Sequence, residues 1–438
     1  MRLRFTSLLF LSCALTANSA WAEGEETVSI LPTIDYSGDL ADRSTLTGDW
    51  GGVRNDLSKN GVQFDTSLNH VTAHVAQGGG GGRFASHFLP SSDDTETHMS
   101  YDNVLRVDTG KAGLWPGGVL TLRGEGRVGE GVNGRAGTIA PVDGDALFPL
   151  DRFGKSIYDL DEATFTQFVS PYAGVMGGIV NTLDADNIAF SDNTRLEGQF
   201  FNLAFGVNPV QLAMAPYKSL GAGLILLPTK NPNDMILSAV VMNHEDSSGE
   251  DPFEHDQGTS TAVEFANFHH LGSLPGKQVI GYMYTDDDFR SLDDPRIGIA
   301  GREIEKRSGS NAAYYSFNQY LIVQKESPQE TTGIGLFGRF GLSDGNPNPI
   351  RYAVNFGVGG NTPWRELDTF GVGYYFIDAS DEAFVERTRI DDEQGIEAWY
   401  NVGITPWLHL TPDFQYVNSG LPGSGDVYIF GIRTHVTF

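Results

Sequence analysis

The chain has 438 residues, of which 40% are hydrophobic and 11% aromatic, and its 29 Lys and Arg against 56 Asp and Glu give a formal net charge of -27. So acidic a chain offers no basic face for phosphate groups, which excludes nucleic acid as a partner. The apolar and aromatic content is too high for a disordered acidic chain, so the sequence predicts a large folded structure.

The chain starts with the pattern of a cleavable signal peptide, residues 1–22. A basic start precedes a short apolar stretch, and residues 20–22 read Ala-Trp-Ala, the A-x-A site that signal peptidase recognises. We therefore expect an exported mature chain that begins at Glu23. The single cysteine, Cys13, falls inside this leader, so the mature chain has no thiol for a disulfide bond.

Two short regions precede the main part of the chain. We assign residues 23–48 to an N-terminal periplasmic segment. Residues 49–61 place Trp50, Val53 and Leu57 at helical spacing and end on an Asn-Gly stop. This pattern predicts a short helix near the periplasmic mouth of the fold that follows.

From residue 62 to the C-terminus, the chain contains many stretches in which apolar and polar residues alternate, as in β-strands with two unlike faces. In residues 119–128, Leu, Gly and Val alternate with Thr, Arg and Glu. The same period recurs in residues 333–341, 351–358, 369–376, 408–417 and 427–438. Turn-forming sequences separate these stretches, for example Asp344-Gly345 and residues 420–425.

These stretches indicate a membrane-spanning barrel. No run beyond the leader approaches the roughly 20 consecutive apolar residues of a membrane helix, whereas strands of about ten residues with one apolar face suit a closed barrel. The last strand ends the chain on Phe438, as outer-membrane barrels do, and residues 62–438 can supply about 16 strands. We predict an all-β fold: a transmembrane antiparallel β-barrel with a short N-terminal helix, in the outer membrane of a Gram-negative cell.

Several motifs resemble, in their order, the carbohydrate-selective porin (OprB) family. They are LTGDWGGVRNDLSKNGVQF near the N-terminus, then Trp-Pro-Gly-Gly at 115–118, GLFGRFG at 335–341, FGVGYYF at 370–376 and EAWYNVGITPWLHLTPDFQYV at 397–417. The similarity runs over nearly the whole mature chain. It implies a 16-stranded barrel, with a homotrimer as one assembly, inward-folded loops that narrow the channel, and an arginine-bearing constriction that favours neutral sugars such as glucose.

The candidate pore-lining residues are mostly arginines. Sugars present hydroxyl groups and weakly apolar ring faces, so a selective pore needs charged or amide side chains for hydrogen bonds and aromatic rings for stacking. Alternation places Arg123, Glu125 and Arg127 together on the polar face of one strand. The further candidates are Arg106, Arg339, Arg351, Arg433 and, in a loop, Arg83, with Arg152 as a second loop arginine. The alternative is that these charges only solvate one another inside the barrel.

Aromatic residues fit two places in such a barrel. Five of them suit the girdle of rings that faces lipid at the membrane interface: Trp364, Trp399, Trp407, Tyr374 and Phe430. Tyr375 falls on the lumen face by alternation. Three others are expected in a loop that folds inward: Phe153, Tyr158 and Phe165.

Motifs for other chemistry are weak. Residues 124–129 (GEGRVG) match the dinucleotide-binding fingerprint, but they end a strand instead of opening a helix. His70 and His74 would lie about 13 Å apart on a strand, too far to share a metal ion. Acidic residues 286–288 and 391–393 are expected as solvated loop tips rather than cation sites. The sequence therefore predicts no metal, no cofactor and no catalytic group.

The resemblance, with the charged face of Arg123, Glu125 and Arg127 as its local support, implies passive, carbohydrate-selective diffusion of small, glucose-like sugars, with outer-membrane lipid and lipopolysaccharide around the barrel. One alternative is a porin for other small solutes, where the acidity of the chain favours cations. A more distant one is an outer-membrane barrel enzyme, although no G-x-S-x-G elbow occurs. A soluble periplasmic binding protein is disfavoured, since the chain lacks alternating strands and helices.

Overall fold

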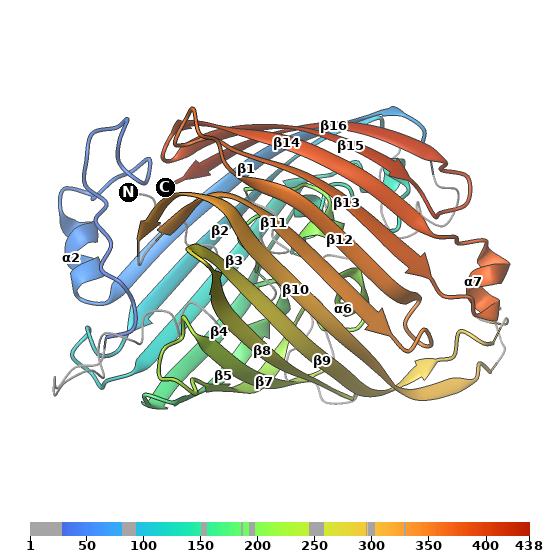
Figure 1. Ribbon diagram of the computed structural model, residues 1–438, viewed down its shortest axis with the longest axis horizontal. Helices are drawn as coiled ribbons and strands as arrows, with labels where there is room; N and C mark the ends of the chain where they lie inside the picture. The colour runs from blue at the N-terminus through green and yellow to red at the C-terminus, as the bar shows by residue number, and fades with distance from the viewer. Residues whose placement is uncertain are drawn as a thin grey trace.

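The computed structural model describes residues 29–80, 93–149, 156–184, 187–191, 198–244, 258–294, 296, 303–327 and 330–438. Within these ranges, sixteen antiparallel strands form a closed barrel in which each strand pairs with its neighbours in the chain and β1 pairs with β16 (Figure 1). The predicted fold class is confirmed. The expected signal peptide lies outside the described residues.

The strands follow one another with few helices between them. They are β1 (Val62–Gln77), β2 (Thr95–Asp108), β3 (Gly118–Gly129), β4 (Ser156–Ser170), β5 (Ala173–Asn181), β6 (Lys218–Leu226), β7 (Met235–Asn243), β8 (Thr259–Leu271), β9 (Leu274–Arg290), β10 (Lys306–Ser327), β11 (Glu330–Ser343), β12 (Ile350–Asn361), β13 (Thr369–Ala379), β14 (Glu393–Thr405), β15 (Leu408–Asn418) and β16 (Asp426–Thr437). The helices are α2 (Val53–Lys59), α4 (Asn133–Ala136), α5 (Leu203–Gly206), α6 (Pro209–Leu212) and α7 (Ala383–Thr388), with 3-10 turns η2 (Asp145–Leu147) and η3 (Thr182–Asp184). The six stretches predicted from alternation correspond to β3, β11, β12, β13, β15 and β16.

Strand β3 shows how alternation sets the two faces of the wall. Arg123, Glu125 and Arg127 are 3%, 3% and 8% exposed, whereas Val128 is 45% exposed. The polar residues therefore point into the barrel and the apolar ones point outward. A slip of one residue in the pairing would exchange the faces, which would put three charges against lipid.

The two ends of the barrel differ in the length of their connections. The C-terminus and α2 lie at one end and α7 at the other (Figure 1). At the first end several connections are very short, such as those at 171–172, 272–273 and 406–407, while the opposite end carries the long connections 130–155 and 182–217. Outer-membrane barrels keep their short turns in the periplasm, so we call the end with the C-terminus the periplasmic end.

The helix expected over residues 49–61 is shorter, Val53–Lys59, because the backbone before it is left-handed. Trp50, Gly51 and Gly52 have φ values of 55°, 69° and 95°, which a helix cannot include. The predicted stop is present: Gly61 has a φ of 80°, and a Cβ there would lie 2.7 Å from the backbone oxygen of Asp108. Only glycine fits this close turn into β1.

The N-terminal segment enters the periplasmic mouth of the barrel. The backbone N–H groups of Ile30 and Leu31 donate to Asp108 Oδ2 at 2.6 and 2.9 Å. Both side chains are buried in an apolar cluster with residues of the strands, among them Val119 and Phe168. Residues 30 and 31 therefore cover part of the mouth themselves, in addition to the helix that was expected there.

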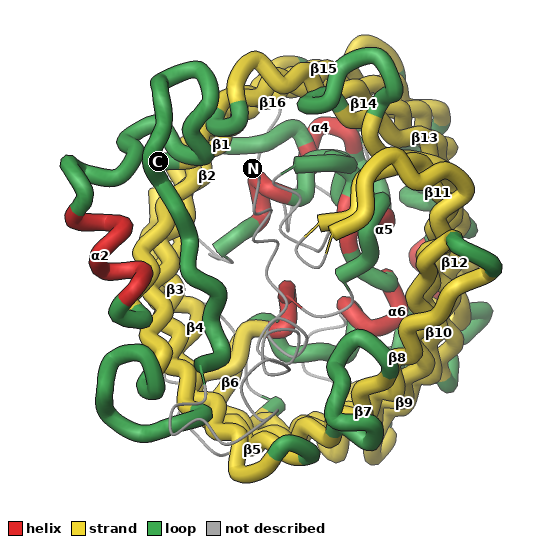
Figure 2. Tube along the Cα trace, turned by 60° about the vertical axis from the view of Figure 1, so that its left-hand side comes forward, coloured by secondary structure: helices red, strands yellow, loops and turns green. Residues whose placement is uncertain are grey.

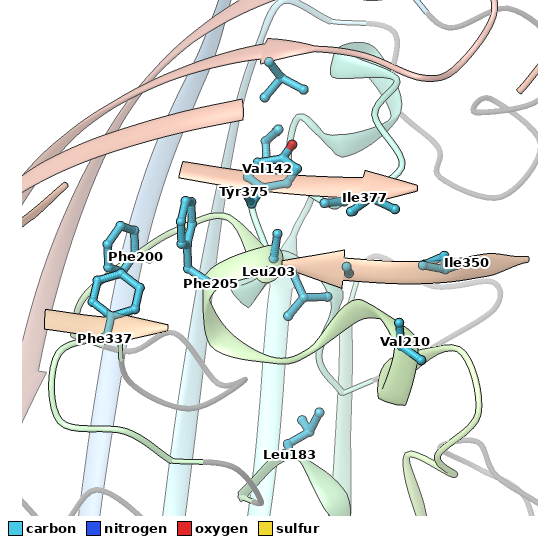
Figure 3. Packing of buried hydrophobic residues seen from close by; sticks show 14 of the residues in the cluster. Val142, Leu183, Phe200, Leu203, Phe205, Val210, Phe337, Ile350, Tyr375 and Ile377 are labelled. Carbon is cyan, nitrogen blue, oxygen red and sulfur yellow. The ribbon is translucent and has the colours of Figure 1, made fainter. Parts of the chain in front are cut away.

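Two of the long connections fold inside the barrel. Helices α4, α5 and α6 lie within the ring of strands (Figure 2). Their apolar side chains pack against inward-facing residues of β1 and of β9 to β16, and together they form the largest buried cluster. Within this cluster, the rings of Phe200 and Phe205, from the connection at 182–217, pack edge-on against the ring of Phe337 of β11 (Figure 3). Among the described residues, no helix is long and apolar enough to cross a membrane.

Candidate functional site

A row of charged side chains stands on the inner face of β3 and its neighbours. We call Arg123, Glu125 and Arg127 the charged ladder. Arg123 Nη1 lies 3.5 Å from Asp102 Oδ1 of β2, and Arg123 Nε lies 3.8 Å from Glu162 Oε2 of β4. These charges are almost fully buried, so each guanidinium needs the facing carboxylates. The ladder is thus a preorganised row of hydrogen-bond donors and acceptors.

The connection at 182–217 contacts the charged ladder at its middle residue. Tyr217 Oη–H donates to Glu125 Oε2 at 3.3 Å. Beside this contact, the ammonium group of Lys218 pairs with Asp159 of β4. A side chain of an inward loop therefore reaches the charged wall at Glu125.

The other inward connection is tied to the wall through Asp145 of η2. Ser100 Oγ–H donates to both oxygens of Asp145, at 2.9 and 2.8 Å, and His98 Nε2 lies 3.0 Å from Asp145 Oδ2. Ser100 stands opposite Arg127 in the β2–β3 register. The end of the charged ladder therefore borders the point where this loop is attached.

Two of the predicted arginines hold a loop instead of standing in the ladder. Arg339 of β11 is 2% exposed, and its Nη1–H donates to Ser191 Oγ at 2.5 Å and to the Phe205 carbonyl. Arg433 of β16 is 1% exposed, and its Nη2–H donates to the Gln199 carbonyl at 2.7 Å. Both side chains face inward, as alternation predicts, but they are bonded to the connection at 182–217.

The remaining arginines occupy separate places. Arg106 of β2 is half-buried and stands opposite Thr121 of β3, on the inward face and nearer the periplasm. Arg351 lies at the outer rim, 40% exposed, where its guanidinium bonds to Asp378 at 2.5 Å and Asp381 at 2.7 Å. It is therefore apart from the charged ladder. The two predicted loop arginines, Arg83 and Arg152, lie outside the described residues, as does Phe153.

Several expectations for the aromatic residues need correction. Trp399, assigned to the lipid-facing girdle, is 4% exposed and packs edge-on against Phe200 inside the barrel. Tyr158 and Phe165, expected in a loop, belong to β4. Tyr158 is 56% exposed and stacks on Tyr101, so it faces outward.

The other aromatic predictions have simpler outcomes. Phe430 and Trp364 are exposed, at 52% and 69%, and Tyr374 and Trp407 are partly exposed. Tyr375 faces inward as predicted, but it is 1% exposed, beneath the loops, and its Oη–H donates to Glu393 Oε1 at 3.0 Å. Tyr375 therefore gives the charged ladder no exposed ring on which a sugar could stack.

The motifs set aside for metal and nucleotide binding have ordinary structural places. GEGRVG lies within β3 and does not begin a helix. His70 and His74 are both exposed on β1. In the part of the chain that the structure describes, no three His, Cys, Asp or Glu residues are grouped to hold a metal ion.

Comparison with known proteins assigns the family. The model of the carbohydrate-selective porin, OprB family, matches residues 96–438, which is most of the chain. The chain belongs to this family. It is a family of channels rather than enzymes, and membership together with the barrel fold places this porin in the outer membrane.

Individual relatives of the porin are distant. Porin B of Pseudomonas aeruginosa is 23% identical over 191 residues, which cover 38% of this chain and 42% of that protein. The match thus spans less than half the length of this curated relative. The high-pH structure of Pseudomonas putida OprB is 18% identical, with a TM-score of 0.76, and the match covers 92% of this chain and 100% of that chain. The low-pH structure of the same protein is 14% identical, with a TM-score of 0.54 over 91% and 99%. At these identities the likeness shows the shared fold.

Two inward-facing carboxylates of the porin were missed by sequence reasoning. Glu393 was expected at a solvated loop tip, yet it is fully buried, and Glu397 is 1% exposed. Both accept hydrogen bonds from backbone N–H groups of the inward loops. A signal was present: Glu393, Gly395 and Glu397 have the period of one strand face, which marks carboxylates that point into a barrel.

Proposed function

We propose that this porin lets small, glucose-like sugars diffuse passively across the outer membrane. The observation that carries the proposal is the charged ladder, which faces the interior where an inward loop approaches the wall. Guanidinium groups donate hydrogen bonds and carboxylates accept them, and each sugar hydroxyl can take part in both kinds of bond. Membership of a carbohydrate-selective family supports sugars as the class of solute.

Within this proposal, Arg123, Glu125 and Arg127 line the constriction, and a sugar meets only the small part of each residue that is exposed, 3%, 3% and 8%. Arg106 extends the same inward face toward the periplasm. Arg339 and Arg433 act indirectly, because their bonds hold the loop that contacts the ladder at Glu125. Passage requires no cofactor, since diffusion down a gradient needs only favourable and short-lived contacts.

The direct test is single-channel conductance in planar bilayers, titrated with several mono- and disaccharides. We expect glucose to reduce the ionic current at concentrations where a disaccharide has little effect, because a narrow constriction admits and holds the smaller sugar. A barrel that conducts ions normally but whose current no sugar changes would contradict the proposal.

The second candidate is a cation-preferring porin for other small solutes. The net charge of -27 favours it, as do the inward-facing carboxylates Asp102, Asp161 and Glu162. Reversal potentials measured across a salt gradient distinguish the two. A strong cation preference without sugar block would favour this candidate, whereas weak ion selectivity with block by glucose supports the sugar porin.

The surroundings of the barrel are also part of the proposal. Its outward face carries exposed apolar side chains such as Phe356, Ile396 and Ile432, at 53%, 44% and 43% exposure, which suit contact with lipid and with the acyl chains of lipopolysaccharide. We keep a homotrimer as a prediction. Light scattering of the detergent complex, corrected for detergent, tests it: a mass of one chain would contradict it.

A further inference from the structure

Two carboxylates on β14 attach the two inward loops to the wall. Glu397 accepts the backbone N–H groups of Phe201 and Asn202 at 2.5 and 2.9 Å. Glu393, four residues earlier on the same face, accepts those of Ile139 and Ala140 at 2.6 and 2.8 Å. Each carboxylate thus binds two consecutive N–H groups of one loop.

These attachments lie where the two loops also bind each other. The N–H of Leu203 donates to the Pro141 carbonyl at 2.9 Å, and the N–H of Gly144 donates to the Phe201 carbonyl at 2.9 Å. The side chain of Gln415 on β15 adds a bond to the Val142 carbonyl at 2.8 Å. The two loops are therefore bonded to each other as one loop unit, and β14 binds this unit at two points, Glu393 and Glu397.

The loops depend on such points because the regular elements in their described parts are short. Helices α4, α5 and α6 have four residues each, too few to hold their own shape. A buried carboxyl group whose two oxygens accept two consecutive N–H groups fixes the direction of both peptide planes, and loss of one oxygen would leave a buried N–H without its acceptor. Since Glu393 and Glu397 are 0% and 1% exposed, water cannot readily replace either set of bonds.

From this arrangement we infer that Glu393 and Glu397 are positioning residues of the pore. They fix the loop unit at a set distance from the charged ladder, where Tyr217 meets Glu125, and so determine how wide a solute can pass. The inference deepens the proposed function and rests on it for the link to solutes. The holding of the loops by β14 stands on the contacts alone.

The test uses cysteine reporters, because Cys13 in the leader is the only cysteine of the chain. Ala204→Cys and Ala140→Cys place thiols in the two loops at positions that are 1% and 4% exposed. A charged, membrane-impermeant thiol reagent should label either one slowly while the loops are held. Glu397→Gln places an amide N–H₂ against a backbone N–H, so it should speed labelling at position 204 by roughly tenfold or more. Glu393→Gln should do the same at position 140.

Three further measurements make the result specific. Glu397→Asp keeps two carboxyl oxygens as acceptors on a shorter side chain and should restore part of the protection. Glu326→Gln, at a carboxylate of β10 that is half exposed, makes the same chemical change away from the loops and should alter nothing. A gel shift on heating shows that each variant barrel is folded. In the folded Gln variants, salt conductance should rise and discrimination between mono- and disaccharides should fall.

The possible outcomes distinguish a failure of this inference from a failure of the proposed sugar function. Unchanged labelling and conductance in both Gln variants would overturn the positioning role, as would thiols at 204 and 140 that are labelled in the parent as fast as in the heat-unfolded chain. A different outcome is that sugars do not block the current of the parent, while the Gln variants still speed labelling of the cysteine reporters. The proposed sugar function would then be wrong, and the attachment of the loops to β14 would still be supported.

Discussion

Arg54 of α2 donates from Nη2 to the main-chain oxygen of Phe438, which follows β16, at 2.9 Å. The same nitrogen donates to the Phe64 carbonyl at 2.7 Å and to Asp65 Oδ1 at 2.9 Å, both at the start of β1. The guanidinium also lies over the ring of Tyr36, 3.8 Å from its centre. One buried side chain therefore ties the N-terminal segment to both strands that close the barrel.

Arg54→Ala should destabilise the barrel by about 3 kcal/mol, because the carbonyl groups of Phe64 and Phe438 lose this donor and Asp65 loses its ion pair and keeps only the hydrogen bond from Tyr36. The measurement is the temperature at which the gel mobility of the detergent-solubilised barrel changes. Lys59→Ala is the control: Lys59 and Asp56 form a pair whose side chains are 65% and 73% exposed, and such pairs contribute at most about 1 kcal/mol. Equal transition temperatures for both variants would show that Arg54 does not secure the seam.

Replacing Arg123 and Arg127 together by Ala should raise single-channel conductance and weaken block by glucose. The double change removes the donors of the charged ladder and leaves wider space at Glu125. Arg351→Ala is the matched control, since it removes an inward-alternating arginine that sits at the outer rim. A double variant with unchanged conductance and block would remove these residues from the constriction.

Phe200→Ala should loosen the interior loops. Its ring packs on those of Phe205, Phe337 and Trp399, with centroids 4.3, 5.4 and 5.7 Å away. Loss of a buried phenyl ring costs about 3–5 kcal/mol, and we expect this to appear as larger current fluctuations in the open channel. Phe430→Ala makes the same truncation on the outward face, where the residue is 52% exposed, and should not increase the current fluctuations of the open channel. Equal noise in the two variants would argue against an interior role.

The hydrogen bond between Asp294 and the Glu305 amide, at the outer end of the barrel, should be insensitive to pH above about 4. Hydrogen bonds from Arg296 hold the pKa of Asp294 well below its usual range, helped by the N–H of Glu305, which donates to Asp294 Oδ2 at 3.0 Å. A depressed pKa contributes stability above the ordinary value of 3.8, and this stability is lost only as pH falls toward the depressed one.

Hydrogen exchange of the Glu305 amide checks this expectation. Protection in the parent should be flat from about pH 5 to 8 after correction for the intrinsic rate. In Asp294→Asn, exchange should be several-fold faster at every pH, because the anion that accepts this N–H is gone. A parent whose protection falls steadily across that range would contradict the assigned pKa direction.

The barrel could be predicted because its signal is local. Alternation within β3 is enough to place Arg123, Glu125 and Arg127 on one face, whatever the rest of the chain does. The same rule would have placed Trp399 inside, two residues after Glu397. The girdle prediction for Trp399 is wrong because it rests on residue type, whereas the position in the strand decides which face a side chain takes.

β4 was missed for a different reason. A register shift lies between Arg123 and Gly124 of β3, where their β4 partners jump from Glu162 to Leu160 and skip Asp161. Asp161 and Glu162 are consequently both fully buried, which breaks the alternation that identifies a strand. A bulge of this kind depends on the partner strand, and one strand's sequence does not reveal it.

The loop attachments were out of reach of pattern analysis. Glu393 bonds to Ile139 across 254 positions and Glu397 to Phe201 across 196. No periodicity connects such distant residues, and only the folded chain brings them together. The residues that hold the pore's shape are therefore harder to find from sequence than the residues that stand in its wall.

The interior of the barrel has two unlike sides. The apolar cluster backs the loops on β9 to β16, while the charged ladder stands on β3 between carboxylates of β2 and β4. A round ring of strands thus encloses an interior that is apolar on one side and charged on the other, and because it is built of L-amino acids, this interior is a handed environment for a chiral solute that contacts both sides. D-glucose and L-glucose have the same size and polarity. A difference between their rates of passage would therefore measure this handedness alone.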